Sequence, residues 1–244
     1  MNTDKNSYTI IYAAIMVVVA AVLLAGAATV LKPAQQANEK IDKMQQILRS
    51  VGQTPEISQV EATYKTIIKK ELLVDLDGSV KSEFDAEAES KAFKLNTENL
   101  FKVFAKEGKA EDGFPLYIAE VDGKTAYILP MNGAGLWGPI WGYIALDAAD
   151  HSTVIGVDFG NKGETPGLGA EISTPTFANL FVGKQVYRDG AFKSIAVVKA
   201  GKVLSDQDYV DGISGGTLTS DGVHAMLEAS ISPYQKFLES YNAQ

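Results

Sequence analysis

The chain has 244 residues, of which 46% are hydrophobic, and it carries a formal net charge of −8 with a sequence pI near 4.9. Binding to a phosphate backbone needs clustered Lys and Arg, so this acidic balance excludes nucleic acid as a partner. Without cysteine the chain has no disulfide, no Cys-ligated iron–sulfur cluster and no c-type haem, and the spacing of His151 and His224 predicts no metal site.

Residues 10–31 form an uncharged apolar stretch in which only Tyr12 and Thr29 are polar. At about 1.5 Å per residue this stretch is long enough to cross a bilayer core. A signal peptide cut after residues 25–27 is the alternative, but the apolar run is longer than such a peptide needs and only Lys5 precedes it as a basic residue. We therefore expect an uncleaved transmembrane helix at 10–31, preceded by a short end at 1–9. The flanking charges leave its orientation open.

Residues 32–71 contain two amphipathic helical patterns, at 36–49 and 55–70. We interpret this segment as a helical linker whose apolar faces pack either on the chain's own domain or on a partner. A single domain is then expected at 72–244. Within it, 72–76 predicts a strand that ends at the turn Asp77-Gly78, and the acidic stretch 83–89 is expected to be solvated.

The centre of the domain is rich in strand patterns. Residues 116–121 and 125–129 flank Asp122-Gly123, which is a strong hairpin signal. Further strands are expected at 140–146, 153–159 and 195–198. Apolar residues recur at spacings of three and four between 221 and 241, which predicts a final helix that begins near Thr219.

Residues 133–138 match G-x-G-x-x-G, the fingerprint of dinucleotide-binding folds. That motif requires a helix directly after the glycines to bind the pyrophosphate. Here Pro139 and another strand pattern follow, so we reject the dinucleotide interpretation. The remaining structural interpretation is a glycine turn with Trp137 and Trp141 as core aromatics.

Residues 163–169, Gly-Glu-Thr-Pro-Gly-Leu-Gly, combine three glycines and a proline in a short segment. Such a loop lets its backbone approach a flat ligand closely, with Leu168 as an apolar face and Glu164 and Thr165 as polar edges. An ordinary turn is the alternative.

Residues 211–220, Asp-Gly-Ile-Ser-Gly-Gly-Thr-Leu-Thr-Ser, place hydroxyls and glycines directly before the last helical pattern. A helix start with free N–H groups and a positive dipole end suits a phosphate. The alternative is that Thr217, Thr219 or Ser220 only caps the helix.

The same residues contain G-x-S-x-G, the nucleophile motif of serine hydrolases, with Ser214 as its serine. That motif needs a preceding strand and a later acid and histidine. Residues 205–209 have the composition of a polar loop, and the downstream histidine, His224, is expected on the same helix as the motif. We therefore keep the hydrolase only as a distant alternative.

Three segments, 135–142, 163–169 and 211–220, together resemble the FMN-binding domains of the NqrC family, which are found in sodium-translocating NADH:quinone reductases, and of the related RnfG proteins of Rnf complexes. In these domains the first threonine after the glycine pair carries FMN through a phosphoester, which implies covalent attachment at Thr217. Two positions depart from the family, since Gly216 replaces a usual alanine and Lys162 replaces a frequent histidine or glutamine. The resemblance implies a cofactor-binding set made of Trp137, Glu164, Thr165, Gly167, Leu168, Gly169, Lys199, Asp211, Ser214, Gly215, Gly216, Leu218 and Thr219, and no catalytic residue.

The resemblance implies an α+β fold with a mostly antiparallel sheet and flanking helices behind a single transmembrane helix. It also implies an electron-carrying subunit of a translocase that oxidises NADH, reduces ubiquinone and exports sodium. The expected partners are the other subunits of that complex and a magnesium-dependent FAD:protein FMN transferase. The expected location is the bacterial inner membrane, with residues 1–9 cytoplasmic and the large domain periplasmic.

Two alternatives remain besides the hydrolase. One is an RnfG protein of the Rnf electron transport complex, which has the same covalent FMN chemistry; residues 135–138 and the long linker favour NqrC. The other is a membrane-anchored module that binds a dissociable phosphate ligand at the helix start.

Overall fold

The computed structural model describes residues 6–240. The expected N-terminal end up to residue 5 and the expected last apolar position of the final helix, Tyr241, lie outside the described residues. The chain forms two compact units, Met1–Asp42 and Lys43–Gln244, and each is considered by itself.

The first unit consists of most of one long helix, α1, which spans Asn6–Arg49. It continues through Pro33, whereas the sequence predicted separate helices at 10–31 and 36–49. Proline removes one backbone donor and crowds the preceding turn, but the helical pairing on both sides holds the helix together. Within α1, the segment Ser7–Arg49 is long and apolar enough to cross a membrane. This agrees with a single-pass anchor.

The last turns of α1 belong to the second unit, which begins at Lys43. Met44, Ile47 and Leu48 are buried there. The helix ends in a Schellman motif, in which Gly52, at φ +75°, donates to the carbonyl of Arg49 and the next residue donates to that of Leu48. The compact unit thus begins before the boundary predicted at residue 72, because these buried side chains form part of its core.

An antiparallel six-stranded sheet forms the centre of the second unit, in the order β2-β1-β3-β4-β5-β6. The strands are β1 Ile68–Val74, β2 Val80–Asp85, β3 Phe114–Val121, β4 Lys124–Ala134, β5 Pro139–Asp147 and β6 Val154–Asn161. Asp122 and Gly123 both have positive φ, which matches the hairpin turn predicted between β3 and β4. The acidic stretch at 83–89 is exposed in part, but its first residues pair with β1 as strand β2, which the sequence did not predict.

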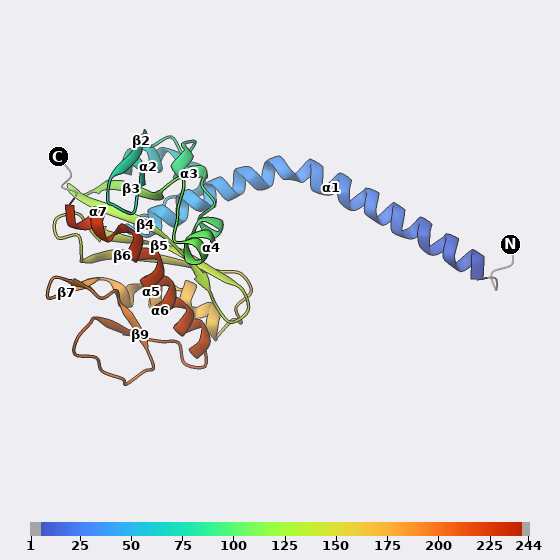
Figure 1. The fold of residues 1–244 in the computed structure, drawn as a ribbon. Coiled ribbons are helices and arrows are strands. Elements are labelled where there is room, and N and C mark those ends of the chain that lie inside the picture. The colour runs from blue at the N-terminus through green and yellow to red at the C-terminus, as the bar shows by residue number, and fades with distance from the viewer. Residues whose placement is uncertain (1–5, 241–244) are drawn as a thin grey trace. The chain divides into compact units, whose positions relative to one another are not determined.

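Helices cover both faces of this sheet, since successive side chains of a strand point to opposite faces. On one face α4 Thr97–Glu107, α6 Thr217–Ile231 and α7 Gln235–Ser240 pack on the main core, which includes Tyr127 and Leu129 (Figure 1). The other face carries Tyr117 and Tyr143, whose rings pack 6.2 Å apart, and it contacts the end of α1 through the ion pair of Arg49 with Asp158. The observed α+β architecture confirms the predicted fold class.

The remaining elements are short and connect these layers. They are α2 Val60–Ile67, α3 Lys91–Lys94, α5 Pro175–Ala178, β7 Tyr187–Arg188, β8 Ala191–Phe192, β9 Ala196–Val198 and β10 Tyr209–Asp211, with 3₁₀ turns at Ile57–Gln59, Gly169–Ser173, Asn179–Phe181 and Ser232–Tyr234. The predicted linker helix at 55–70 is therefore shorter than expected, because β1 already begins at Ile68. The final helical pattern is divided by the 3₁₀ turn that contains Pro233, which cannot continue the hydrogen bonding of α6.

Candidate functional site

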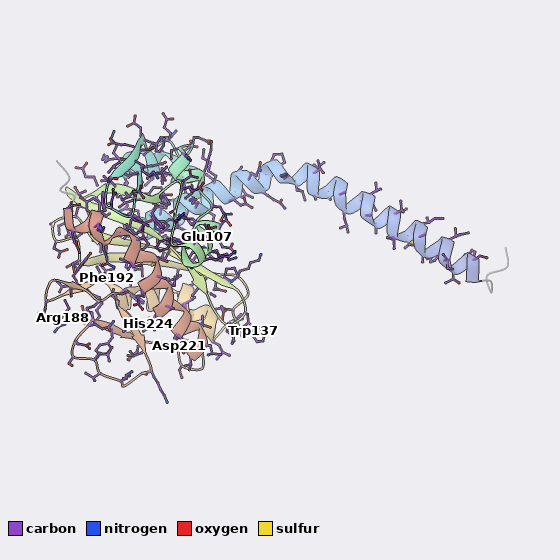
Figure 2. All side chains as sticks on the ribbon, viewed as in Figure 1. Glu107, Trp137, Arg188, Phe192, Asp221 and His224 are labelled. Carbon is purple, nitrogen blue, oxygen red and sulfur yellow. The ribbon has the colours of Figure 1, made fainter. Side chains whose placement is uncertain are left out.

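The glycine motif at 133–138 forms the turn between β4 and β5, closed by a 2.8 Å hydrogen bond from Gly135 N to the carbonyl of Gly138. A strand follows the turn, so the rejection of a dinucleotide site is confirmed. Trp137 is 68% exposed at the edge of the domain (Figure 2), and the interpretation of this side chain as a core aromatic is wrong. Trp141 is half-buried and donates to Gln46 Oε1 at 3.0 Å.

The loop before α6 ends at Gly216, which is the N-cap residue, and no side chain caps the helix. Ser220 Oγ instead accepts from Ile213 N and donates to the carbonyl of Gly216, both at 2.9 Å, which folds the loop onto the first turn. None of the three candidate hydroxyls is therefore a helix cap. The backbone N–H groups at the start of α6 keep the arrangement that suits an anion.

The loop at 163–169 lies against this helix start. Gly167, at φ +75°, turns the chain and donates to Glu171 Oε1 at 3.0 Å. Leu168 is 42% exposed, and a Cβ at Gly215 would lie 2.8 Å from its Cδ2. The two glycine-rich loops predicted separately from the sequence are thus in direct contact.

Glu164 connects both loops to the Trp137 turn. Its side chain is buried, with the residue only 5% exposed; it accepts from Trp137 N at 2.8 Å and from Thr219 Oγ1 at 2.6 Å. The carboxylate therefore points inward and offers no polar edge to a ligand, in contrast to the expectation. Thr165 is exposed, as expected of a residue on the edge of the loop.

The hydroxyl-bearing side chain of Thr217 is exposed at the first position of α6 and lines a pocket of about 150 Å³. Lys199 lines the same pocket, because the parallel pairing of β9 with β10 places the end of β9 beside the loop. Asp221, one helical turn after Thr217, also lines it. The sequence analysis missed Asp221, although the spacing of four residues on a predicted helix was a usable signal.

The remaining members of the predicted set surround this pocket. Asp211 ends β10, and Ser214, Gly215 and Leu218 lie around the start of α6, with Ser214 and Gly215 on the pocket wall. Gly169 contacts the helix start directly, since a Cβ there would lie 2.5 Å from Thr219 Oγ1. The structure thus brings all the predicted residues together at one end of the sheet.

The serine hydrolase was kept only as a distant alternative, partly for lack of a preceding strand, and that argument is wrong, because β10 does precede the loop. The histidine argument stands. His224 Nδ1 accepts from Val197 N at 3.3 Å, so this ring is bound to the backbone of β9, and Ser214 is exposed.

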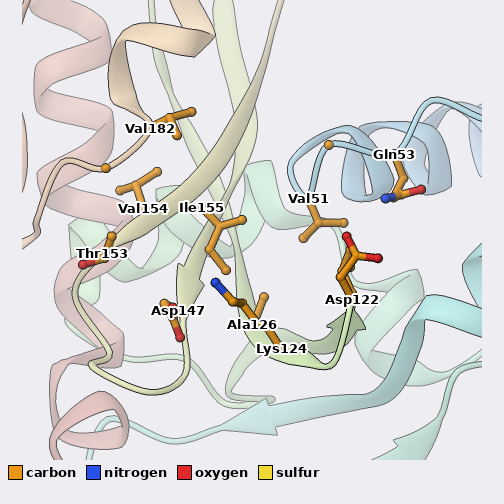
Figure 3. Close-up of a pocket in the computed structure, with 13 residues that line it drawn as sticks. Val51, Gln53, Asp122, Lys124, Ala126, Asp147, Thr153, Val154, Ile155 and Val182 are labelled. Atoms are coloured by element: carbon orange, nitrogen blue, oxygen red, sulfur yellow. The ribbon is translucent and has the colours of Figure 1, made fainter.

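Figure 3 shows a larger cavity, of about 590 Å³, whose lining includes Lys124 and Ala126 from the start of β4. Its lining is largely aliphatic, with Asp122, Lys124 and Asp147 as the charged residues; the aliphatic side chains include Val51, Ala126, Val154, Ile155 and Val182. No residue of the three glycine-rich loops lines this cavity, so the candidate site rests on the chemistry of the smaller pocket.

The fold and the converging loops define an FMN-binding domain, and the family model of that description matches residues 135–232. The chain is 33% identical to NqrC, a subunit of the Na(+)-translocating NADH-quinone reductase, of Haemophilus ducreyi, over 91% of this chain and 88% of the relative. It is also 33% identical to the corresponding protein of Yersinia pestis, over 91% and 87%. The chain belongs to the NqrC family of Na⁺-translocating NADH-quinone reductases.

Solved structures agree with this assignment. The crystal structure of the corresponding protein from Parabacteroides distasonis matches with a TM-score of 0.75 and 48% identity, covering 87% of this chain and 98% of that one. Shewanella oneidensis NqrC matches with a TM-score of 0.66 and 28% identity, covering 83% and 97%. The family resemblance inferred from the three sequence segments is confirmed, and these relatives are of the NqrC type that the sequence favoured over RnfG.

Proposed function

We propose that this protein holds FMN covalently on Thr217, through a phosphoester, and relays electrons between the redox subunits of its complex. The observation that carries the proposal is the exposed Thr217 side chain at the uncapped start of α6, in a pocket shared with Lys199. Thr217 provides the oxygen for a phosphoester, and the helix start provides the environment for the phosphate.

The electrostatics of the pocket favour a phosphate at this position. The first N–H groups of α6 have no intrahelical partner, and the helix dipole adds partial positive charge there. No acidic residue lies in the first turn of the helix, and Lys199 brings a cation to the pocket. Asp221 also lines the pocket, but it lies one turn further along α6 and not in the first turn, where the free N–H groups are.

The isoalloxazine ring has apolar surface available beside the attachment point. Trp137, Leu168 and Leu218 are exposed large hydrophobic residues from the three converging segments. Exposed apolar side chains of this size around a polar anchor suit a flat aromatic ligand. The proposed direct contacts are those of Trp137, Thr165, Gly167, Leu168, Lys199, Asp211, Ser214, Gly215, Gly216 and Leu218.

Bound FMN would supply one- and two-electron chemistry, while this chain binds and orients it. Attachment requires a partner enzyme, which we propose is a magnesium-dependent FAD:protein FMN transferase. The Thr217 oxygen would form a bond to the FMN phosphorus of FAD, the bond to AMP would break, and the hydroxyl proton would leave with the transferase base. No group is oxidised or reduced in this step.

The membrane arrangement is also part of the proposal. The apolar helix would anchor the chain once in the bacterial inner membrane, with the first residues cytoplasmic and the FMN-binding domain periplasmic. A covalent tether then prevents loss of the cofactor in a compartment from which free FMN would diffuse away. Alkaline phosphatase fused after the last residue should be active, and a bright cytoplasmic fluorescent reporter at the same position would contradict this topology.

The decisive experiment removes the Thr217 hydroxyl while keeping the shape of the side chain. After co-expression with the transferase, wild type and Thr217→Ser should give a fluorescent denatured band with the mass of one added FMN, and Thr217→Val should give a dark band. Ser214→Ala, a neighbouring exposed hydroxyl, should remain fluorescent at lower yield. A fluorescent Thr217→Val band would overturn the attachment site, and a dark wild-type band would overturn covalent attachment altogether.

A further inference from the structure

Glu164 is the residue through which three separate segments of the candidate site are joined. Its Oε1 accepts the backbone N–H of Trp137 at 2.8 Å, and its Oε2 accepts the hydroxyl of Thr219 at 2.6 Å. The partners come from the β4–β5 turn and from the first turn of α6, while Glu164 itself comes from the loop after β6. One carboxylate therefore fixes the relative position of all three.

The surroundings of this carboxylate are shaped to hold it. A Cβ at Gly135 would lie 2.5 Å from Glu164 Oε1, and a Cβ at Gly169 would collide with Oε2 and lie 2.5 Å from Thr219 Oγ1. Glu164 and Thr219 are 5% and 1% exposed. Across residues 6–240 no lysine or arginine forms an ion pair with Glu164, so neutral donors alone compensate its burial.

We infer that Glu164 and Thr219 are positioning residues for the flavin, which hold the exposed Trp137 turn and the Leu168 loop in register with the attachment point on α6. Their side chains contact the protein and not the cofactor. The flavin part of this inference rests on the proposed attachment at Thr217. The coupling of the three segments does not rest on that attachment, because its hydrogen bonds are present in the protein without cofactor.

The test uses the full chain in detergent and compares Thr219→Val with Thr219→Ser. Hydrogen exchange of the 134–139 peptide, read by mass spectrometry without flavin, should become about tenfold faster in Thr219→Val, because half of the carboxylate's hydrogen bonding is lost. Thr219→Ser keeps the hydroxyl and should restore the slow rate. Glu164→Gln keeps an acceptor for Trp137 N and should also exchange slowly.

Ser230→Ala is the matched control. Ser230 is a buried residue of α6, the helix that carries Thr219. Its hydroxyl accepts from the backbone N–H of Asn132 on β4, the strand that leads into the Trp137 turn, at 3.1 Å. Its loss weakens the packing of α6 on β4 without touching Glu164. Slow exchange at 134–139 in Ser230→Ala is expected, and fast exchange there would show that general loosening of α6 explains the Thr219→Val result and would overturn the inference.

The second measurement is the absorption spectrum and midpoint potential of the attached flavin. Both should shift in Thr219→Val and return to wild-type values in Thr219→Ser. Unchanged exchange in Thr219→Val overturns the coupling, and changed exchange with an unchanged flavin overturns the positioning role. A shifted potential in Glu164→Gln with wild-type exchange would assign the carboxylate a direct electrostatic role instead. A wild-type protein that acquires no flavin at Thr217 overturns the proposed function but leaves the exchange result as it stands.

Discussion

Two buried glutamates, Glu71 and Glu164, lie in different parts of the domain and perform different tasks. Glu71 is fully buried on β1, where it accepts from the Tyr64 hydroxyl at 2.8 Å, from Ala88 N at 3.2 Å and from the Ser90 hydroxyl. Glu164 is equally shielded but lies in a loop, and its donors also come from a turn and a helix start. The hydrogen-bond donors to both carboxylates are neutral, and Glu71 in addition interacts electrostatically with the ammonium of Lys43.

The difference lies in the elements that each carboxylate joins. Glu71 joins β1, the strand next to the edge strand β2, to α2 and to the segment before α3, so it holds together parts of the framework. Glu164 joins loops that carry the exposed residues of the site. Buried polar groups of the same chemistry can therefore serve either stability or geometry, and the connected elements indicate which.

The largest expected effect is a loss of stability when Glu71, which holds parts of the framework together, is replaced. Glu71→Ala leaves the hydroxyls of Tyr64 and Ser90 and the N–H of Ala88 buried without their acceptor, which should lower the free energy of unfolding by about 3 kcal/mol. Urea denaturation followed by circular dichroism would measure the loss. Glu120→Ala, which removes an exposed carboxylate at the end of β3, should change stability by less than about 0.5 kcal/mol. Equal stability of the two variants would contradict the framework role of Glu71.

The next effect falls on the site. Gly169→Ala inserts a methyl group against Glu164 and Thr219, and this overpacking should cost about 2 kcal/mol. Peptide-resolved hydrogen exchange should show the loss at 134–139, at 163–169 and at the start of α6. Peptides from β1 and β2 should exchange as in wild type, and faster exchange there would mean that the two glutamates do not define separate regions.

A smaller effect is expected when only one donor to Glu71 is removed. Tyr64→Phe should lower the free energy of unfolding at neutral pH by about 1.5 kcal/mol, because one hydrogen bond to a carboxylate is lost. Burial, with the charge of Glu71 and the neighbouring tyrosines adding to it, raises the pKa of Tyr64 well above 10.0. The contribution of Tyr64 is therefore fully present below pH 10 and is lost as the pH rises from there towards the raised pKa.

The free energy of unfolding, measured between about pH 9 and about pH 12, would detect this titration. The window begins about one unit below the ordinary tyrosine pKa and ends about two units above it. Wild type should lose stability more steeply than Tyr64→Phe, because its folded state retains a proton that the unfolded chain releases. Parallel curves for the two proteins would show that the Tyr64 phenol does not titrate differently in the folded state.

The smallest effect is expected at Gly216, where the family usually has alanine. A Cβ there would lie 3.2 Å from Gly169 N and from the Ile213 Cβ, and the residue has φ −113°, which any side chain tolerates. Gly216→Ala should therefore change stability by less than about 1 kcal/mol and leave flavin attachment intact. A loss as large as that of Gly169→Ala in a thermal melt would be inconsistent with the contrast between these two glycines.

The regular parts of the fold were predictable where the pattern was local. The β3–β4 hairpin followed from Asp122-Gly123, since both residues tolerate the positive φ that the turn requires. Strand β2 was missed, because this edge strand is largely exposed and has only Val80 and Phe84 as apolar residues, too few to form a recognisable apolar face. The continuity of α1 was missed for a different reason: proline predicts a weakened or ended helix, and no local pattern showed that helical hydrogen bonding on both sides would carry α1 through Pro33.

The site was predictable as a set of loops but not as a set of contacts. Glycines and hydroxyls identified each loop by itself. The hydrogen bond from Thr219 to Glu164 joins residues 55 positions apart, and no local pattern distinguishes it from a helix cap. The close approach of α6 to β4, where Gly222 lies against the carbonyl of Ala134, is likewise a product of tertiary packing.

The uncapped start of α6 has a consequence for the life of the protein in the cell. Under the proposed attachment, a chain that has not received its cofactor keeps N–H groups without side-chain caps at the start of α6, whereas the phosphate of a loaded chain satisfies them and adds its binding free energy to the stability of the folded state. Unloaded copies would open more often at this point and would be cut first by proteases. The backbone N–H groups that bind the phosphate would then link cofactor attachment to survival, because chains with attached FMN would last longer than chains without it.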